Sequence, residues 1–96
     1  MKTRESVRRK ITVGNTRGLH LRPAAELARL CNEFAGCVHI WKGDASQREE
    51  AINAKSIISM LLLAVRSGET LIFEANGLDA ELLLDRVCDV LERRTA

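Results

Sequence analysis

The chain has 96 residues, 46% of them hydrophobic, and a formal net charge of +2 at pH 7. This length suits one small domain with a single core, and the charge is too small to indicate nucleic acid as a partner. The longest apolar block, Met60–Val65, is too short for a membrane span or a secretory signal, so we expect a cytoplasmic protein with no membrane insertion. Three cysteines (Cys31, Cys37 and Cys88) without a C-x-x-C pair indicate small buried hydrophobes rather than disulfides or a zinc site.

The chain starts with a polar segment. We expect residues 1–6 to be a flexible basic terminus and residues 7–96 to form one domain. Val7, Ile11 and Val13 alternate and predict a strand over 7–13, with Ile11 and Val13 facing inward. A basic run that could instead touch RNA or an acidic surface overlaps this strand and consists of Arg4, Arg8, Arg9 and Lys10.

Residues 14–25 form the most informative stretch, Gly-Asn-Thr-Arg-Gly-Leu-His-Leu-Arg-Pro-Ala-Ala. Pro23 suits a first helical turn, which places His20 at a strand-to-helix junction, just ahead of free backbone amides. An anion on this imidazole would lie against those amides, and Arg22 could add a forked donor. Taken singly, His20 is equally consistent with a helix cap or a surface residue, and Arg22 with a solvated side chain. Together they favour a histidine placed to hold a phosphoryl group.

Helical spacing of apolar residues predicts a helix over 22–35, ended by Gly36 as a C′ residue. A strand is expected over 37–42, with Val38 and Ile40 on one face and Trp41 on the other. His39 lies on the same face as Trp41. It could be a metal ligand, but no partner stands at ligand spacing, so we interpret it as a sheet-face histidine and expect no metal site.

Residues 43–50 predict a turn and a charged, solvated stretch, followed by a third strand over 49–54. Ser56 is a candidate N-cap for a short helix over 57–65 that Gly68 closes. Eight of the nine residues in this helix are apolar. They could all fill a thin core, but one face of so short a helix cannot bury them all. We therefore expect an exposed docking patch that includes Ile57, Ile58 and Leu61.

The last two elements are a strand over 69–76 and a helix capped by Asp79. Leu71, Phe73 and Ala75 face inward from the strand. The core stripe of the helix is Ala80, Leu83, Leu84, Val87 and Leu91, while Arg93 and Arg94 near its end suit the helix dipole. The predicted order is β-α-β-β-α-β-α. It indicates an α+β fold, a four-stranded antiparallel sheet with three helices on one face.

Two motifs make the chain resemble a known family. They are Gly18-Leu19-His20-Leu21-Arg22-Pro23-Ala24-Ala25 and Asn53-Ala54-Lys55-Ser56-Ile57-Ile58. Both are similar to motifs of the HPr family, the small histidine phosphocarriers of the bacterial phosphoenolpyruvate-dependent phosphotransferase system. The likeness covers about residues 7–93. It implies the open-faced β-sandwich of that family, with one sheet face bare. The hairpin at about 43–50 is longer than the family's usual tight connection.

The resemblance also implies a function. Nδ1 of His20 would accept a phosphoryl group from enzyme I and pass it to enzyme IIA domains of sugar permeases. Arg22 and the backbone amides of Leu21 and Arg22 would hold the phosphate, and the docking surface would comprise Leu21, Ile57, Ile58 and Leu61. Such a protein is a monomeric carrier that needs no cofactor, rather than a catalyst in its own right.

Ser56 matches the position that a dedicated kinase phosphorylates in the HPr proteins of many bacteria. An HPr kinase/phosphorylase is therefore a candidate partner, and the added charge would oppose docking. Three alternatives remain open. One is a carrier for a nitrogen-type regulatory branch, which Arg17 and the long hairpin allow. Another is a non-phosphorylated regulatory binding module. The third is an RNA-binding domain that uses the basic run.

Overall fold

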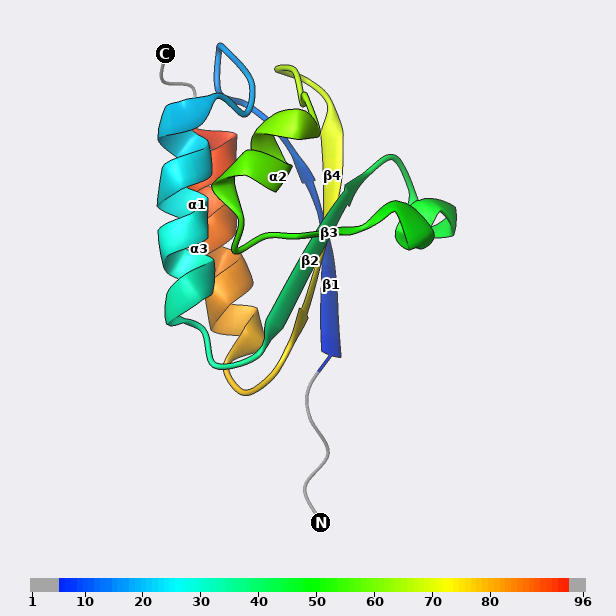
Figure 1. Ribbon diagram of the computed structural model, residues 1–96, viewed down its shortest axis with the longest axis vertical. Helices are drawn as coiled ribbons and strands as arrows, with labels where there is room; N and C mark the ends of the chain where they lie inside the picture. Colours follow the sequence, from blue (N-terminus) through cyan, green and yellow to red (C-terminus); the bar gives the residue numbers. More distant parts are fainter. Residues whose placement is uncertain (1–5, 94–96) are drawn as a thin grey trace.

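The computed structural model describes residues 6–93, so residues 1–5 of the predicted basic terminus 1–6 and residues 94–96 lie outside the described residues. Ser6 is the first residue of the first strand, so the predicted boundary after residue 6 is one residue too late. Four strands and three α-helices follow the predicted order, with one additional 3-10 helix (Figure 1). The elements in chain order are β1 (Ser6–Thr12), α1 (Leu21–Glu33), β2 (Cys37–Lys42), η1 (Ala45–Glu50), β3 (Ile52–Asn53), α2 (Ile57–Leu62), β4 (Thr70–Asn76) and α3 (Ala80–Glu92).

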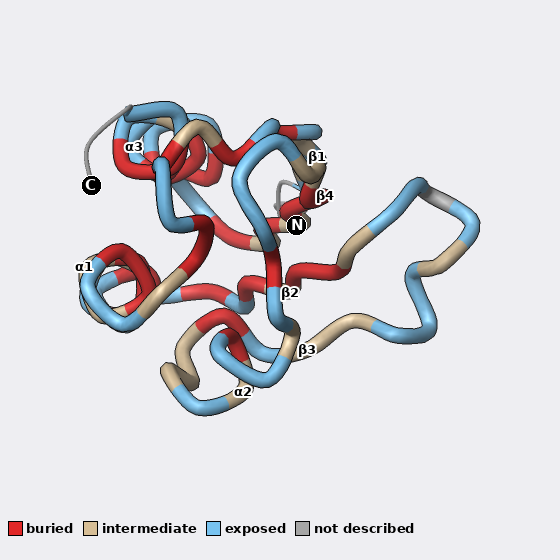
Figure 2. The backbone as a smooth tube through the Cα atoms, turned by 90° about the horizontal axis from the view of Figure 1, so that it is seen from above, coloured by how far each residue is buried: buried red, intermediate tan, exposed pale blue. Residues whose placement is uncertain are grey.

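The strands form one antiparallel sheet in the order β1-β4-β2-β3. All three α-helices lie on the same face of this sheet (Figure 1). The core fills the space between the two layers, and the buried stretches of tube in Figure 2 turn toward it. The predicted fold class is thereby confirmed. No helix within residues 6–93 is both long and apolar enough to cross a membrane.

Helix α1 shows why the sequence forms these layers. Its buried residues are Pro23, Ala24, Leu27, Ala28 and Cys31, which recur at helical spacing and face the core. The helix ends at Glu33, before the predicted Ala35, because Phe34 turns to extended backbone (φ −82°, ψ 134°). Gly36 serves a different purpose from the predicted helix cap, since its Cα packs directly against the carbonyl of Asn76 and leaves no room for a Cβ.

The connection between β2 and β3 differs from the prediction. The third strand is only Ile52–Asn53 instead of 49–54, because residues 45–50 form η1. A capping box starts η1, in which the Asp44 side chain accepts from the backbone of Ser46 and Gln47 Oε1 accepts from the Asp44 amide. Local side-chain bonds therefore replace strand pairing over most of this segment. Figure 2 shows the loop projecting away from the sheet.

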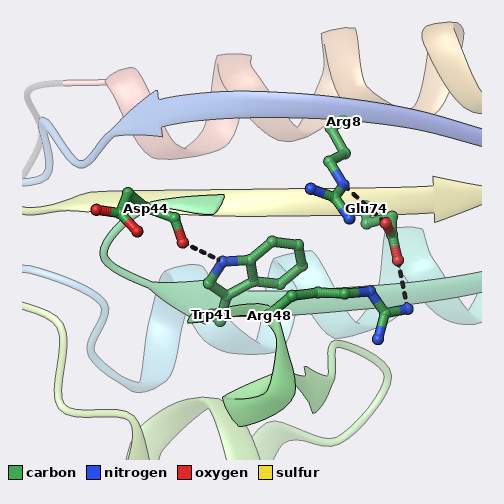
Figure 3. Close-up of polar contacts among 5 residues, drawn as sticks. All are labelled: Arg8, Trp41, Asp44, Arg48 and Glu74. Atoms are coloured by element: carbon green, nitrogen blue, oxygen red, sulfur yellow. Dashed lines mark hydrogen bonds and ion pairs between the residues drawn. The ribbon is translucent and has the colours of Figure 1, made fainter. Parts of the chain in front are cut away.

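The outer sheet face is not bare at Trp41, which is completely buried. The expectation of a bare face is therefore wrong at this position. The indole Nε1 donates to the Asp44 carbonyl at 2.8 Å, and the Arg8 guanidinium lies 5.3 Å from the ring centroid. Glu74 accepts from Arg8 at 2.8 Å and from Arg48 of η1 at 2.7 Å (Figure 3). The long hairpin thus supplies a small polar cover over the indole.

Three further details correct the sequence analysis. Helix α2 ends at Leu62, not at 65, and the chain leaves it through Ala64 at φ 56° before reaching Gly68. Asp79 occupies the N-cap position of α3, but its φ is 65° and its side chain makes no capping bond. Cys31 is buried as predicted, whereas Cys37 is exposed and Cys88 is partly exposed.

Candidate functional site

The loop that carries His20 is fixed by close backbone packing. Gly18 adopts φ 71°, and a Cβ there would clash with the carbonyl oxygen of Val65 and lie 2.9 Å from Cα of Arg66. The next amide, that of Leu19, donates to the same Val65 carbonyl at 2.9 Å, and the Leu19 side chain is buried. The loop is therefore pinned against the chain that leaves α2, immediately before the histidine.

His20 is the N-cap residue of α1, with extended backbone (φ −91°, ψ −173°) and a partly exposed side chain. Its imidazole makes no capping hydrogen bond, so the ring is not used as a helix cap. The first helical bond runs from the amide of Ala24 to the His20 carbonyl at 3.0 Å. The amides of Leu21 and Arg22 precede it and have no intrahelical acceptor, while Pro23 has no N–H to offer. The junction predicted from the sequence is confirmed.

A small cavity of about 30 Å³ adjoins the imidazole. It brings together side chains from three segments, namely Asn15, His20, Arg22, Pro23, Glu26, Val90 and Arg93. Arg22 and Arg93 contribute two positive charges, and Glu26 contributes one negative charge that lies 3.5 Å from the Arg93 guanidinium. The balance favours an anion next to the ring. A larger groove of about 400 Å³ lies at the opposite ends of α1 and α3, but its lining contains no histidine or cysteine.

Asn15 is a site residue that the sequence analysis does not single out. It is 3% exposed, and its Nδ2 donates to the carbonyls of Val90 and Arg93, both at 3.1 Å. The amide of Gly14 beside it donates to the Leu91 carbonyl at 2.7 Å. These bonds tie the loop to the end of α3, about 75 residues away along the chain. No local sequence signal reveals such a long-range contact.

Apolar side chains are exposed around the histidine loop and on α2. The exposed fractions are 62% for Leu21, 71% for Ile58, 36% for Leu61 and 79% for Leu62. Ile57, which we expected to be exposed as well, is half-buried and packs against the core. Leu62 is the most exposed of these residues, although the sequence did not single it out.

Ser56 caps α2 as predicted. Its Oγ accepts from the amide of Ser59 at 3.1 Å, and the side chain is partly exposed. The hydroxyl therefore has a structural role in the protein as it stands.

Much of the basic run near the N-terminus is used within the fold. Arg9 bridges to Glu81 at 2.5 Å and to Asp85 at 2.7 Å, and the bond to Asp85 helps to raise the pKa of its guanidinium. Arg8 is held by Glu74 and Trp41. Because Trp41 is buried, it offers no platform on which a base could stack. These contacts disfavour the RNA-binding alternative.

His39 is partly exposed, and residues 6–93 contain no group of three or more His, Cys, Asp or Glu side chains that could hold a metal.

Comparison with known proteins adds independent information. Residues 7–93 match the family model described as the PTS HPr component phosphorylation site. The chain is 33% identical over 86 residues to the phosphocarrier protein NPr of Shewanella violacea, covering 90% of this chain and 89% of that protein. It is 30% identical to the phosphocarrier protein HPr of Cupriavidus necator, covering 92% and 93%. The crystal structure of HPr from Bacillus anthracis superposes with a TM-score of 0.78 at 29% identity, covering 90% and 96%.

Proposed function

The chain belongs to the PTS HPr family, whose members are phosphocarriers rather than catalysts, and from this premise we propose that His20 is its phosphoryl acceptor. One observation carries the proposal above all others. The imidazole of His20 is partly exposed and is not used as a helix cap, although it stands at the N-cap of α1. A reactive ring at a helix start is what a phosphohistidine carrier requires.

The geometry supports a simple transfer step. The lone pair of Nδ1 of His20 forms the new N–P bond while the bond between phosphorus and the donor's leaving group breaks. The amides of Leu21 and Arg22 face the incoming oxygens from the positive end of α1, and the Arg22 guanidinium adds a forked donor. For this transfer the protein needs only to position the reacting groups and to stabilise the negative charge of the phosphoryl oxygens.

We propose enzyme I as the donor and enzyme IIA domains as the acceptors, met in the cytoplasm by the monomeric carrier. Leu21, Ile58, Leu61 and Leu62 are exposed close to the histidine loop and on α2, and they supply apolar contact area. The half-buried Ile57 supports this surface from below. No cofactor is part of this proposal.

Two branches of phosphotransferase chemistry remain candidates for this carrier. We propose that the carrier takes part in sugar uptake, and the alternative is that it belongs to a nitrogen-type regulatory branch. The alternative is favoured by a specific observation, the similarity to proteins named NPr from Shewanella violacea and Proteus mirabilis. Transfer from the phosphorylated carrier to one purified acceptor domain of each branch separates the two. The faster acceptor identifies the branch.

Phosphorylation is tested by incubation with enzyme I and phosphoenolpyruvate, followed by intact mass measurement. We expect one acid-labile phosphate on the wild type and none on His20→Ala. Arg22→Ala should keep the acceptor but take up phosphate at least tenfold more slowly, because the loss of a charge-assisted hydrogen bond is worth about 1.5–3 kcal/mol. If no phosphate appears under conditions that label an ordinary HPr, the proposal fails, and the regulatory binding module becomes the leading alternative.

Docking is tested by two exposed apolar residues on different helices. Ile58→Glu should slow phosphate uptake at unchanged thermal stability, because the side chain is 71% exposed and contacts the partner rather than the core. Leu82→Glu is the matched control, since Leu82 is 51% exposed but lies on α3 at the opposite end of the molecule from the histidine. Equal effects of the two substitutions would contradict the proposed surface.

We further propose that an HPr kinase/phosphorylase modifies Ser56, in organisms that have one. The cap geometry supports this, because a phosphate at the start of α2 keeps its oxygens near the Ser59 amide while it adds charge beside Ile57 and Ile58. Ser56→Asp should slow uptake from enzyme I more than Ser56→Ala does. Equal rates for the two variants would count against a regulatory role for charge at this position.

A further inference from the structure

In the side-chain amide of Asn15 the nitrogen is hydrogen-bonded, whereas the oxygen has no hydrogen-bond partner among residues 6–93. Nδ2 donates to two backbone carbonyls of α3 and its C-cap, which only an NH₂ group can do, so the assignment of the two amide ends is fixed by the bonds. Oδ1 is buried and has no hydrogen-bond partner among residues 6–93. An unsatisfied buried carbonyl is costly, which makes such groups rare in folded proteins.

Asn15 and His20 line the same cavity. Three other side chains in the lining carry N–H donors, namely those of His20, Arg22 and Arg93. The Arg93 guanidinium is engaged by the Asp89 carbonyl at 3.2 Å and by Glu26 at 3.5 Å. The Arg22 side chain is exposed, whereas the His20 ring is partly buried. The ring N–H of His20 is therefore the donor best suited to a buried acceptor.

We propose that Asn15 is a positioning residue whose Oδ1 accepts a hydrogen bond from one water molecule in this cavity, and that this water in turn accepts from Nε2–H of His20. The cavity of about 30 Å³ has room for a single water molecule. This inference rests on the proposed function, because it assigns the proton to Nε2 and so leaves the Nδ1 lone pair free for phosphorus. Asn15 would then fix the ring tautomer and orientation, while its Nδ2 holds the end of α3.

The test is nuclear magnetic resonance of ¹⁵N-labelled, unphosphorylated protein, which needs no phosphoryl donor. In the wild type we expect the His20 proton on Nε2, with a ring N–H signal that is protected from solvent exchange. Asn15→Ala should accelerate this exchange roughly fivefold, the factor that a hydrogen bond of ordinary net strength gives. The charged groups that face the ring from α1 and the end of α3, Arg22, Glu26 and Arg93, are unchanged in this variant.

Asn15→Asp separates positioning from a merely structural role. Both variants lose the NH₂ group that holds α3, so both should lose thermal stability. The aspartate keeps an acceptor oxygen, and we expect it to retain the protected ring N–H. Equal exchange rates in the wild type and Asn15→Ala, or equally fast exchange in both variants, would overturn the proposal. A failed phosphorylation assay with an intact ring N–H signal would instead point to the proposed function as the error.

Discussion

Gly18 and Gly68 offer a matched test of how the histidine loop is held. Both have positive φ, 71° and 89°, so an alanine at either position costs about 1–2 kcal/mol in backbone strain. Only Gly18 is also packed against backbone, since a Cβ at Gly68 would meet nothing within 4 Å. The extra clash at Gly18 with Val65 and Arg66 adds about 1–3 kcal/mol, because backbone atoms cannot rotate away.

We therefore expect Gly68→Ala to lose about 1–2 kcal/mol and Gly18→Ala about 2–5 kcal/mol of unfolding free energy. For a domain of this size each kcal/mol lowers the melting temperature by about 4–8 °C. Circular dichroism with urea and thermal unfolding measures both differences. Phosphate uptake from enzyme I should fall for Gly18→Ala well below that of Gly68→Ala, measured at a temperature at which both variants are folded. The reason is that the clash displaces the loop two residues before His20.

Equal stability losses for the two variants would show that the loop is not pinned by the α2–β4 connection. Wild-type uptake by a folded Gly18→Ala protein would show that the position of His20 does not depend on that contact. Either result would refute the argument that close backbone packing sets the geometry of the site.

Three other perturbations follow from single contacts. Glu74→Gln should lower the free energy of unfolding by about 1 kcal/mol at pH 7 and make Trp41 more exposed, because it removes the negative charge that Arg8 and Arg48 share. Burial raises the pKa of Glu74, but these hydrogen bonds outweigh it and hold that pKa below its usual value. The wild type is thus more stable than Glu74→Gln above the unfolded-state pKa of Glu74, and this difference in unfolding free energy should vanish as pH falls through the lower folded-state pKa. Urea titrations followed by indole fluorescence at several pH values measure this difference. Ser56→Ala should cost about 1 kcal/mol through loss of the helix cap, measured in the same way. Maleimide at pH 7 should label the exposed Cys37 and spare Cys31 until the protein is denatured, because burial raises the pKa of the Cys31 thiol to about 11. Mass spectrometry measures the labelling, and simultaneous labelling of both cysteines in the folded protein would contradict this prediction.

The parts of the fold and site that could be predicted depend on local chemistry. Pro23 at a first turn, apolar spacing after it and Ser56 before a short helix each determine structure within a few residues. The junction at His20 is therefore found where the sequence places it. The predicted helix ends are less accurate, since the backbone becomes extended at Phe34 and has positive φ at Ala64, two positions without the glycine that favours such an end.

The errors concern residues whose partners are distant in the chain or whose side chains form unusual local bonds. The predicted strand starts at residue 49, three residues before β3, because the sequence analysis does not identify the capping box of Asp44 and Gln47 as the start of a 3-10 helix. The bare outer face is an expectation from the family resemblance, and nothing in the alternation of β2 indicates that Arg8 and Arg48 meet at Glu74. The contacts of Asn15 with Val90 and Arg93 are equally distant in the chain, so no local pattern indicates them.

The placement of Asn15 also addresses an electrostatic problem in this fold. The N-terminus of α1 and the C-terminus of α3, two helices of 13 residues each, meet at one small cavity. The first end attracts a phosphoryl group, whereas the free carbonyls of the second repel it. Asn15 Nδ2 occupies the carbonyls of Val90 and Arg93, and the Arg93 guanidinium adds a positive charge to the lining. The unfavourable helix end is thereby masked, and the positive end of α1 with Arg22 determines the field that an incoming phosphoryl group meets.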